Sequence, residues 1–169
     1  YNRMFSKKEN QIANLMAHIL LAEELDMPMF LHERDACDDM IAIFKDHPGI
    51  IRQSVIHCFT GDRDQLKRYL DLGFMIGITG WICDPRRGKA LQDAVKILPL
   101  DRVMLETDAP YLTPRNVSGL SNINVPENIQ YVARTLAMCM HVQECQLMDA
   151  ARENTIRFFH LPSECGGCK

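Results

Sequence analysis

Several features that mark particular classes of protein are missing from this sequence of 169 residues. No run of about 18 apolar residues occurs, so no transmembrane helix is expected. No basic segment followed by an apolar one precedes the first helical pattern, so no secretory signal is expected either. We therefore expect a soluble intracellular protein, cytoplasmic in the first instance, with the nucleus and organelles left open.

An excess of positive charge is also missing. The formal net charge is −3, which excludes a field that draws the whole molecule onto nucleic acid or anionic lipid. Any contact with nucleic acid must come from a local cluster of cations or from metal ions.

The cysteines lack the pattern of a disulfide framework. There are seven, an odd number, scattered singly along most of the chain. Short secreted chains with disulfides usually carry even numbers, so reduced thiols are expected here. Cys165 and Cys168 form a single C-x2-C pair, whereas a structural zinc site normally needs four ligands. We interpret residues 162–169 as a tail.

Short apolar runs do alternate with helical patterns through most of the chain. Buried strands are expected at residues 29–32, 53–57, 74–78 and 103–106, each followed by a helix or by a loop and a helix. This spacing suits βα units that form a parallel sheet, so the fold class is α/β. The sheet is either doubly wound or part of a (β/α)8 barrel, and a full barrel needs eight strands.

Capping residues mark the expected helix ends between these strands. A Ser6–Glu9 capping box, Asp35, and the pair Asp84–Pro85 are each expected to begin a helix. Gly73 is expected to end the helix that follows the second strand. Residues 109–125, rich in Pro, Ser, Gly and Asn, should form a loop, and two amphipathic helices should follow it.

Three residues of metal-ligand type stand at the ends of predicted strands. His32 closes the first strand, His57 closes the second, and Asp108 follows the fourth. In parallel α/β folds, side chains at the carboxyl ends of strands converge on one crevice. Imidazole and carboxylate suit Zn, Mn or Fe, which would activate water and polarise a phosphoryl or carbonyl oxygen. Taken singly, each His is also explained as a hydrogen-bonded residue and Asp108 as a turn former.

Two positive groups are expected near this crevice. Arg34 lies in the loop after the first strand, where it can clamp a phosphate through two hydrogen bonds. Pairing with Glu33 or Asp35 on the surface is the alternative. Arg86 and Arg87 offer a second positive patch near the mouth, and the alternative for them is simple solvation.

Four longer motifs resemble the strand-end signatures of the TatD family of metal-dependent hydrolases. They are PMFLHERDA (28–36), VIHCFTG (55–61), GFMIGITGWICDPRRG (73–88) and LETDAPYLTPR (105–115). ENTIRFF (153–159) is similar to the closing helix of that family. The motifs occur in the family's order. The resemblance implies a TIM-barrel hydrolase domain at residues 1–161, with 162–169 as a tail.

The resemblance also implies an activity, that of a divalent-metal-dependent deoxyribonuclease with 3′-5′ exonuclease activity. The expected cofactor is Mg, Mn or Zn, as one or two ions, and the expected substrate is DNA, single-stranded or at 3′ ends. No membrane and no obligate protein partner is expected. By match to the family motifs, His32, His57 and Asp108 bind metal, and Asp108 accepts the proton of the attacking water. Arg34 then contacts the substrate phosphate, and Glu106 is a carboxylate that contacts the metal ligands and not the metal itself.

The chain departs from the family pattern at three places. The first-strand His-x-His pair and the Glu of a GE-GLD strand are absent, so we expect only the second half of a barrel, about four βα units with C-terminal helices. The usual Arg-Asn-Glu-Pro stretch appears as Ile-Asn-Val-Pro at residues 123–126, and Glu33 stands where many relatives carry Cys. Half a barrel exposes two sheet edges and an apolar face, so we expect instability or self-association in isolation.

Two other functions stay open from the sequence. A hydrolase of a small ester, amide or phosphoester would use the same strand-end ligands, and only the flanking motifs favour a nuclease. A non-catalytic half-barrel that binds metal or a partner is the other alternative, because the three ligands lack the first-strand pair.

Overall fold

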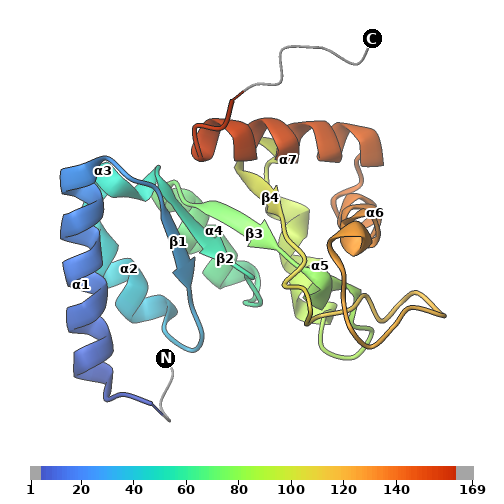
Figure 1. Ribbon diagram of the computed structural model, residues 1–169, viewed down its shortest axis with the longest axis horizontal. Coiled ribbons are helices and arrows are strands. Elements are labelled where there is room, and N and C mark those ends of the chain that lie inside the picture. Colours follow the sequence, from blue (N-terminus) through green and yellow to red (C-terminus); the bar gives the residue numbers. More distant parts are fainter. Residues whose placement is uncertain (1–4, 163–169) are drawn as a thin grey trace.

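A parallel sheet of four strands lies between two groups of helices (Figure 1). The computed structural model describes residues 5–162. The strands are β1 (Met29–His32), β2 (Ser54–His57), β3 (Met75–Ile78) and β4 (Val103–Leu105), in the order β1-β2-β3-β4. Each lies within one residue of its predicted bounds, so the predicted α/β class and the parallel sheet are confirmed.

Helices connect the strands and complete the chain. The α-helices are α1 (Lys8–Leu25), α2 (Cys37–Lys45), α3 (Pro48–Ile51), α4 (Arg63–Leu72), α5 (Lys89–Ala94), α6 (Ile129–Met140) and α7 (Glu144–Phe158). Short 3-10 helices are η1 (Gly80–Cys83), η2 (Val95–Ile97), η3 (Leu100–Arg102) and η4 (Pro126–Asn128). Within residues 5–162, no helix is long and apolar enough to cross a bilayer. Cys165 and Cys168 lie outside the described residues.

The main core lies between the sheet and the helices that connect its strands. Parallel partners in register share a face of the sheet, and one such row is Leu31, Ile56, Ile76 and Val103. These four residues are at most 5% exposed and belong to the large core cluster. The central strands β2 and β3 run as continuous apolar segments because both of their faces are covered.

The opposite face of the sheet is only partly covered. Val55, Met75 and Met104 are buried there with Phe158, from the end of α7. Phe30 on the edge strand β1 remains 54% exposed on this face. The apolar face expected from the sequence is therefore closed at its centre and open at β1. Self-association of the chain stays a prediction.

Two helices near the N-terminus begin differently from the prediction. The N-cap of α1 is Lys7, which makes no side-chain capping bond, so the Ser6–Glu9 capping box is not formed. Asp35 does not cap α2, because its backbone is left-handed (φ 53°) and turns the chain before the helix. The carboxylate of Glu33 instead accepts a hydrogen bond from the N–H of Ala36 at 2.7 Å. Glu33 thus holds the entrance to α2.

Asp84 closes a turn and does not open a helix directly. Its carboxylate accepts hydrogen bonds from the N–H groups of Arg86 (2.9 Å) and Arg87 (3.0 Å), and its carbonyl accepts one from Gly88 (2.8 Å). The carboxylate and carbonyl of Asp84 thus bind N–H groups of a turn at residues 85–88, and α5 begins after this turn, at Lys89. The predicted end of α4 at Gly73 is confirmed, with φ 105°.

The last helix is tied to the last strand by Asn154, the asparagine of the ENTIRFF motif. Its buried side chain donates to the carbonyls of Leu100 (2.8 Å) and Val103 (2.9 Å). Figure 1 shows α7 lying across β4 at the end opposite to the arrowheads of the strands. This contact leaves the carboxyl ends of the strands open.

Candidate metal centre

The carboxyl ends of the strands carry the residues singled out in the sequence. His32 and His57 are the last residues of β1 and β2, and they are partners in register. Glu106 continues β4, since its N–H donates to the carbonyl of Ile78 at 2.9 Å, and Asp108 follows two residues later. Four side chains of metal-ligand type therefore stand at one end of the sheet.

His57, Glu106 and Asp108 form a compact cluster. One ligand atom from each lies within 4.8 Å of the others. The Nδ1 of His57 is 2.9 Å from Oε2 of Glu106, and its Nε2 is 3.6 Å from Oδ1 of Asp108. The two carboxylates thus stand at opposite nitrogens of one ring. This arrangement matches a metal-binding histidine whose second nitrogen is held by a carboxylate.

Glu106 is fitted closely into its place. Its Oε2 also accepts a hydrogen bond from the N–H of Cys58 at 2.9 Å. A Cβ at position 77 would collide with the Glu106 carboxylate, so Gly77 makes the room for it. Its Oε1 is buried and has no hydrogen-bond partner among the described residues. A buried carboxylate oxygen without a partner is costly, and a nearby cation would compensate for it.

The pKa values of the two histidines are shifted in opposite directions. The hydrogen bond to Glu106 raises the pKa of His57 above its usual 6.5, and burial only partly opposes this. Burial, together with the neighbouring His57, lowers the pKa of His32. A neutral imidazole is the form that binds metal, so the low pKa of His32 favours ligation at neutral pH. In His57, an Nδ1–H donated to Glu106 leaves the lone pair on Nε2, on the side of Asp108.

His32 lies beside the cluster and outside the group of three. Its ring centroid is 6.4 Å from that of His57. Of the predicted ligands, the structure therefore brings His57 and Asp108 together and adds Glu106, which was expected only as a supporting residue. His32 occupies the neighbouring strand end.

The backbone is strained next to these ligands. Cys58 (φ 47°) and Asp108 (φ 54°) both adopt the left-handed conformation, which residues other than glycine rarely take. The conformation at Cys58 directs its N–H to Glu106. Such strain is concentrated at functional sites, where surrounding contacts hold it. Burial raises the pKa of the Cys58 thiol to about 12, so this thiol stays protonated at neutral pH.

Asn124 holds the loop that carries Asp108, a role that no sequence pattern predicted. Its buried Nδ2 donates to the carbonyls of Thr107 (2.8 Å) and Tyr111 (2.7 Å), on either side of Asp108. Its own N–H donates to Pro110 at 2.9 Å. Asn124 is therefore a positioning residue. With Pro126, it is one of the two residues that the Ile-Asn-Val-Pro stretch shares with the usual Arg-Asn-Glu-Pro.

A cleft of about 620 Å³ opens over this end of the sheet. It is lined by residues from every strand-end loop, among them His32, Glu33, Arg34, Cys58, Trp81, Asp108 and Tyr111. Arg34, the predicted phosphate contact, thus shares a cleft with Asp108. Metal ligands and a guanidinium in one cleft suit a substrate that carries phosphate.

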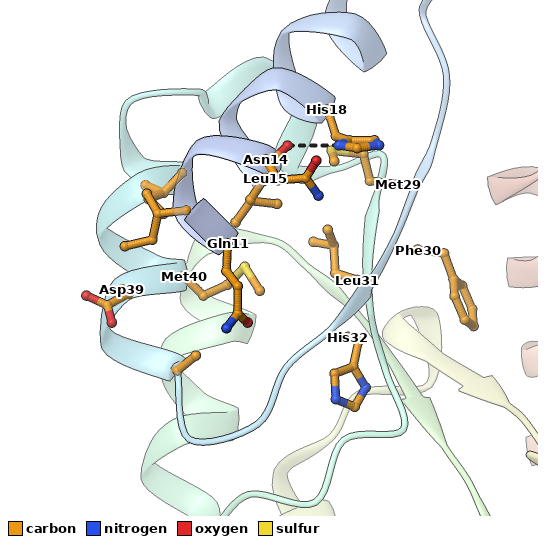
Figure 2. Close-up of a pocket in the computed structure, with 13 residues that line it drawn as sticks. Gln11, Asn14, Leu15, His18, Met29, Phe30, Leu31, His32, Asp39 and Met40 are labelled. Atoms are coloured by element: carbon orange, nitrogen blue, oxygen red, sulfur yellow. Dashed lines mark hydrogen bonds between the residues drawn. The ribbon is translucent and has the colours of Figure 1, made fainter. Parts of the chain in front are cut away.

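A second cavity, of about 380 Å³, lies between α1, β1 and α2 (Figure 2). Leu15, Leu31 and Met40 contribute to its largely apolar lining. His18 in this cavity donates from Nδ1 to the carbonyl of Asn14 at 2.8 Å, which ties it to its own helix. His32 lines both hollows. Asp39 is the one acidic residue among the lining residues of this cavity, whereas Glu33, Asp35 and Asp108 line the cleft.

Comparisons with known proteins agree with this geometry. A family model described as TatD related DNase matches residues 1–160. The chain is 40% identical over 163 residues to "3′-5′ ssDNA/RNA exonuclease TatD" of Rahnella sp., covering 95% of this chain and 62% of that protein. It is 42% identical to the Klebsiella pneumoniae protein of the same name, covering 93% and 60%. The chain thus spans about three fifths of the length of these curated relatives.

Solved structures give the same result for the fold. The TatD homologue YJJV of Escherichia coli k12 superposes with a TM-score of 0.79 at 30% identity, covering 94% of this chain and 61% of that one. A hydrolase TatD family protein of Entamoeba histolytica superposes with a TM-score of 0.80 at 22% identity, covering 94% and 59%, and this likeness concerns the fold alone.

Proposed function

The chain belongs to the TatD-related DNase family, and on this basis we propose that its strand-end cluster serves a divalent-metal-dependent hydrolase of phosphodiester bonds. The observation that carries the proposal is the His57 ring, held at Nδ1 by Glu106 with Asp108 at its Nε2. The Oε1 of Glu106, which has no hydrogen-bond partner among the described residues, supports it, because a nearby cation would offset the cost of burying a carboxylate oxygen.

His57, Asp108 and His32 would hold the ion, and Glu106 would orient His57 behind it. A bound divalent ion lowers the pKa of a coordinated water to about 7 and polarises a phosphoryl oxygen. Carboxylate and imidazole ligands suit Mg, Mn or Zn to different degrees, and one or two ions fit the proposal.

Asp108 would accept the proton of the attacking water. A carboxylate in contact with the metal-binding face of His57 is well placed for this role. Arg34 would bind the phosphate of the substrate, since it lines the same cleft and its planar guanidinium can donate two parallel hydrogen bonds. The cleft's volume of about 620 Å³ accommodates a nucleotide-sized group.

We further propose that β1–β4 form the second half of a (β/α)8 barrel in the whole protein. The sheet is parallel and in sequential order, as barrel strands are. The similarity to solved TatD structures extends over about 60% of those chains, and the exposed Phe30 lies on the strand at the open edge of the sheet.

The substrate would be single-stranded DNA, cut from its 3′ end, with RNA as a second substrate. The relatives' shared name, 3′-5′ ssDNA/RNA exonuclease, supports this choice. The flanking motifs that separate a nuclease from a small-ester hydrolase lie in the part of the chain that matches the family.

The test is release of nucleotides from a 3′-labelled single strand in the presence of Mg²⁺ or Mn²⁺. Asp108→Asn should reduce the rate by at least 100-fold, because it removes a ligand and the proton acceptor together. Asp149→Asn, an exposed carboxylate on α7, is the matched control and should keep full activity. Metal-dependent release that survives in Asp108→Asn, from folded protein, would refute the proposed role of this cluster.

A further inference from the structure

A second hollow continues from the cleft. It has a volume of about 610 Å³, and it shares the lining residues Trp81, Tyr111 and Leu112 with the cleft. Beyond these three, its walls come from Gly80, from the turn at 84–87 and from the long loop at 110–122. A chain-like ligand that fills the cleft can therefore extend into this hollow without leaving the surface.

Three arginines meet one carboxylate in this hollow. The Nε of Arg87 donates to Oδ2 of Asp84 at 3.0 Å, while the Nε atoms of Arg115 and Arg86 lie 3.8 and 4.0 Å from the same carboxylate. Among residues 5–162, all the ion pairs of these arginines go to Asp84. Three positive charges against one negative charge leave a local surplus of two, on a chain whose net charge is −3.

Asp84 acts as an anchor and not as a neutralising partner. Its side chain is only 3% exposed, whereas those of Arg86, Arg87 and Arg115 are 74%, 49% and 58% exposed. The N–H groups of Arg87 and Arg86, with the guanidinium of Arg87, lower the pKa of Asp84 to about 2. The carboxylate is thus ionised at neutral pH and holds the arginines in place from below.

The arginines keep most of their hydrogen-bonding capacity. A guanidinium has five N–H donors, and Asp84 takes one hydrogen bond from the three side chains together. The distances of 3.8 and 4.0 Å for Arg115 and Arg86 are too long for hydrogen bonds. Exposed guanidiniums that are held in place and still have unused N–H donors are suited to phosphate, because a phosphate accepts two parallel hydrogen bonds from one guanidinium.

Aromatic rings lie where the hollow meets the cleft. Tyr111 is 74% exposed, and the guanidinium of Arg87 lies 4.3 Å from the centre of the Trp81 ring. The stacked arginine is pre-ordered, which lowers the entropy lost on binding. An exposed Tyr ring offers a stacking surface for a base, and base–aromatic stacking contributes about 1–3 kcal/mol.

We propose that this hollow, the arginine groove (Asp84, Arg86, Arg87 and Arg115 with Trp81 and Tyr111), binds the phosphodiester backbone of a single-stranded nucleic acid next to the bond that is cut. The inference rests on the proposed nuclease function and adds a subsite to it. Tyr111 stacks on a base at the entrance, and Arg86 and Arg115 contact the following phosphates. A small phosphoester would make all of its contacts within the cleft, so only a longer nucleic-acid strand would gain affinity from the groove.

The test is the salt dependence of strand binding. Arg86→Gln/Arg115→Gln is compared with Arg68→Gln/Arg134→Gln, which removes two exposed, ion-paired arginines elsewhere (45% and 58% exposed). Both pairs are made in the Asp108→Asn background, so that the strand stays uncut. Binding of a fluorescent 12-nucleotide strand, as DNA and as RNA, is measured by anisotropy in Mn²⁺ over a range of NaCl concentrations.

Each phosphate contact contributes about 0.7 to the slope of log K against log salt for a single strand. The groove pair should therefore lower the slope by about 1.4 and weaken binding at least 10-fold at low salt. The control pair should keep the slope of the parent protein. Because the contacts are to the backbone, DNA and RNA should respond alike. Equal slopes in the two pairs would overturn the inference, and a change seen only with DNA or only with RNA would overturn the backbone assignment.

Hydrolysis of bis(p-nitrophenyl) phosphate by the unaltered protein tests the proposed function separately, because this small diester needs no extended groove. If metal-dependent hydrolysis of this diester and of the 12-mer is absent, the nuclease proposal fails, and anisotropy still decides on the groove. For the kinetic test the groove pair and the control pair are also made with Asp108 intact. If hydrolysis occurs and these two variants have equal KM values for the 12-mer, the groove proposal is overturned while the nuclease proposal stands.

Discussion

Glu106 and His57 are joined by a hydrogen bond of 2.9 Å between Oε2 and Nδ1, across the two strands that flank β3. Gly77 of β3 lies between them and leaves room for the carboxylate. Two strands that do not pair with each other are thereby connected through side chains at the carboxyl ends of the sheet.

Glu106→Gln should weaken Mn²⁺ binding by about 10- to 100-fold, as loss of a carboxylate behind a metal-binding histidine typically does. The neutral amide of Gln cannot stabilise positive charge on the imidazole of His57 as the Glu106 carboxylate does when it raises the His57 pKa. Isothermal titration with Mn²⁺ measures the effect. Glu127→Gln, an exposed carboxylate in η4, should bind as the parent does. Equal affinities in the two variants would contradict the role of Glu106.

Gly77→Ala should destabilise the fold by about 1–3 kcal/mol and impair metal binding, because the added methyl group meets the Glu106 carboxylate. Urea unfolding and Mn²⁺ titration measure the two effects. Gly49→Ala is the control, since a Cβ at that position has nothing within 4 Å. Normal stability together with normal metal affinity in Gly77→Ala would show that the carboxylate does not need this space.

Asn124→Ala should lower the free energy of unfolding by about 1–3 kcal/mol, because the carbonyls of Thr107 and Tyr111 lose a buried donor. The loop that carries Asp108 should also become less ordered, so Mn²⁺ affinity should fall. The exposed neighbour Asn122 provides the control Asn122→Ala. A loss of stability without any loss of metal affinity would leave Asn124 as a purely structural residue.

Asp84→Asn should destabilise the protein in a pH-dependent way. The pKa of Asp84 is lowered from 3.8 to about 2 by the N–H groups of Arg87 and Arg86, so its ionised form favours the folded state. That stabilisation is fully present above pH 3.8 and is lost as the pH falls through about 2. The difference between parent and variant should therefore be constant near neutral pH and shrink in this window.

Urea unfolding at a series of pH values between 2 and 7 measures that difference. Asp71→Asn removes an exposed carboxylate paired with Lys67. It is the control and should change the free energy of unfolding by less than about 1 kcal/mol, because an exposed ion pair contributes little. A pH-independent difference for Asp84→Asn would mean that the ionised carboxylate is not what holds the turn.

The strands and the position of the site could be predicted because both depend on local pattern. Four apolar runs at βα spacing placed the strands to within one residue, and His57 and Asp108 fell at the strand ends that converge. The TatD resemblance in the motifs was confirmed by the family match. Metal ligation by His32, His57 and Asp108, proton acceptance by Asp108, and phosphate binding by Arg34 all stay predictions.

The contacts that hold the site in place could not be predicted, because they join residues far apart in sequence. Glu106 was expected behind the ligands, yet its direct bond to His57 spans 49 residues. Asn124 reaches back to Thr107 and Tyr111. The capping roles assigned to Ser6, Asp35 and Asp84 were wrong. The N-cap of α1 is Lys7, Asp35 adopts a left-handed backbone before α2, and the Asp84 carboxylate accepts hydrogen bonds from the turn that precedes α5.

The pairing of His32 with His57 has a consequence for folding. Because the two residues are partners in register, a slip of β1 by one residue against β2 would turn His32 to the helix-covered face of the sheet. An ion that required both imidazoles would bind only the correctly aligned pair. Its concentration would then favour that alignment by mass action, in proportion to RT ln(1 + [L]/Kd). The same two side chains would thus let metal binding stabilise the correct alignment of β1 with β2 over the slipped one while the sheet assembles.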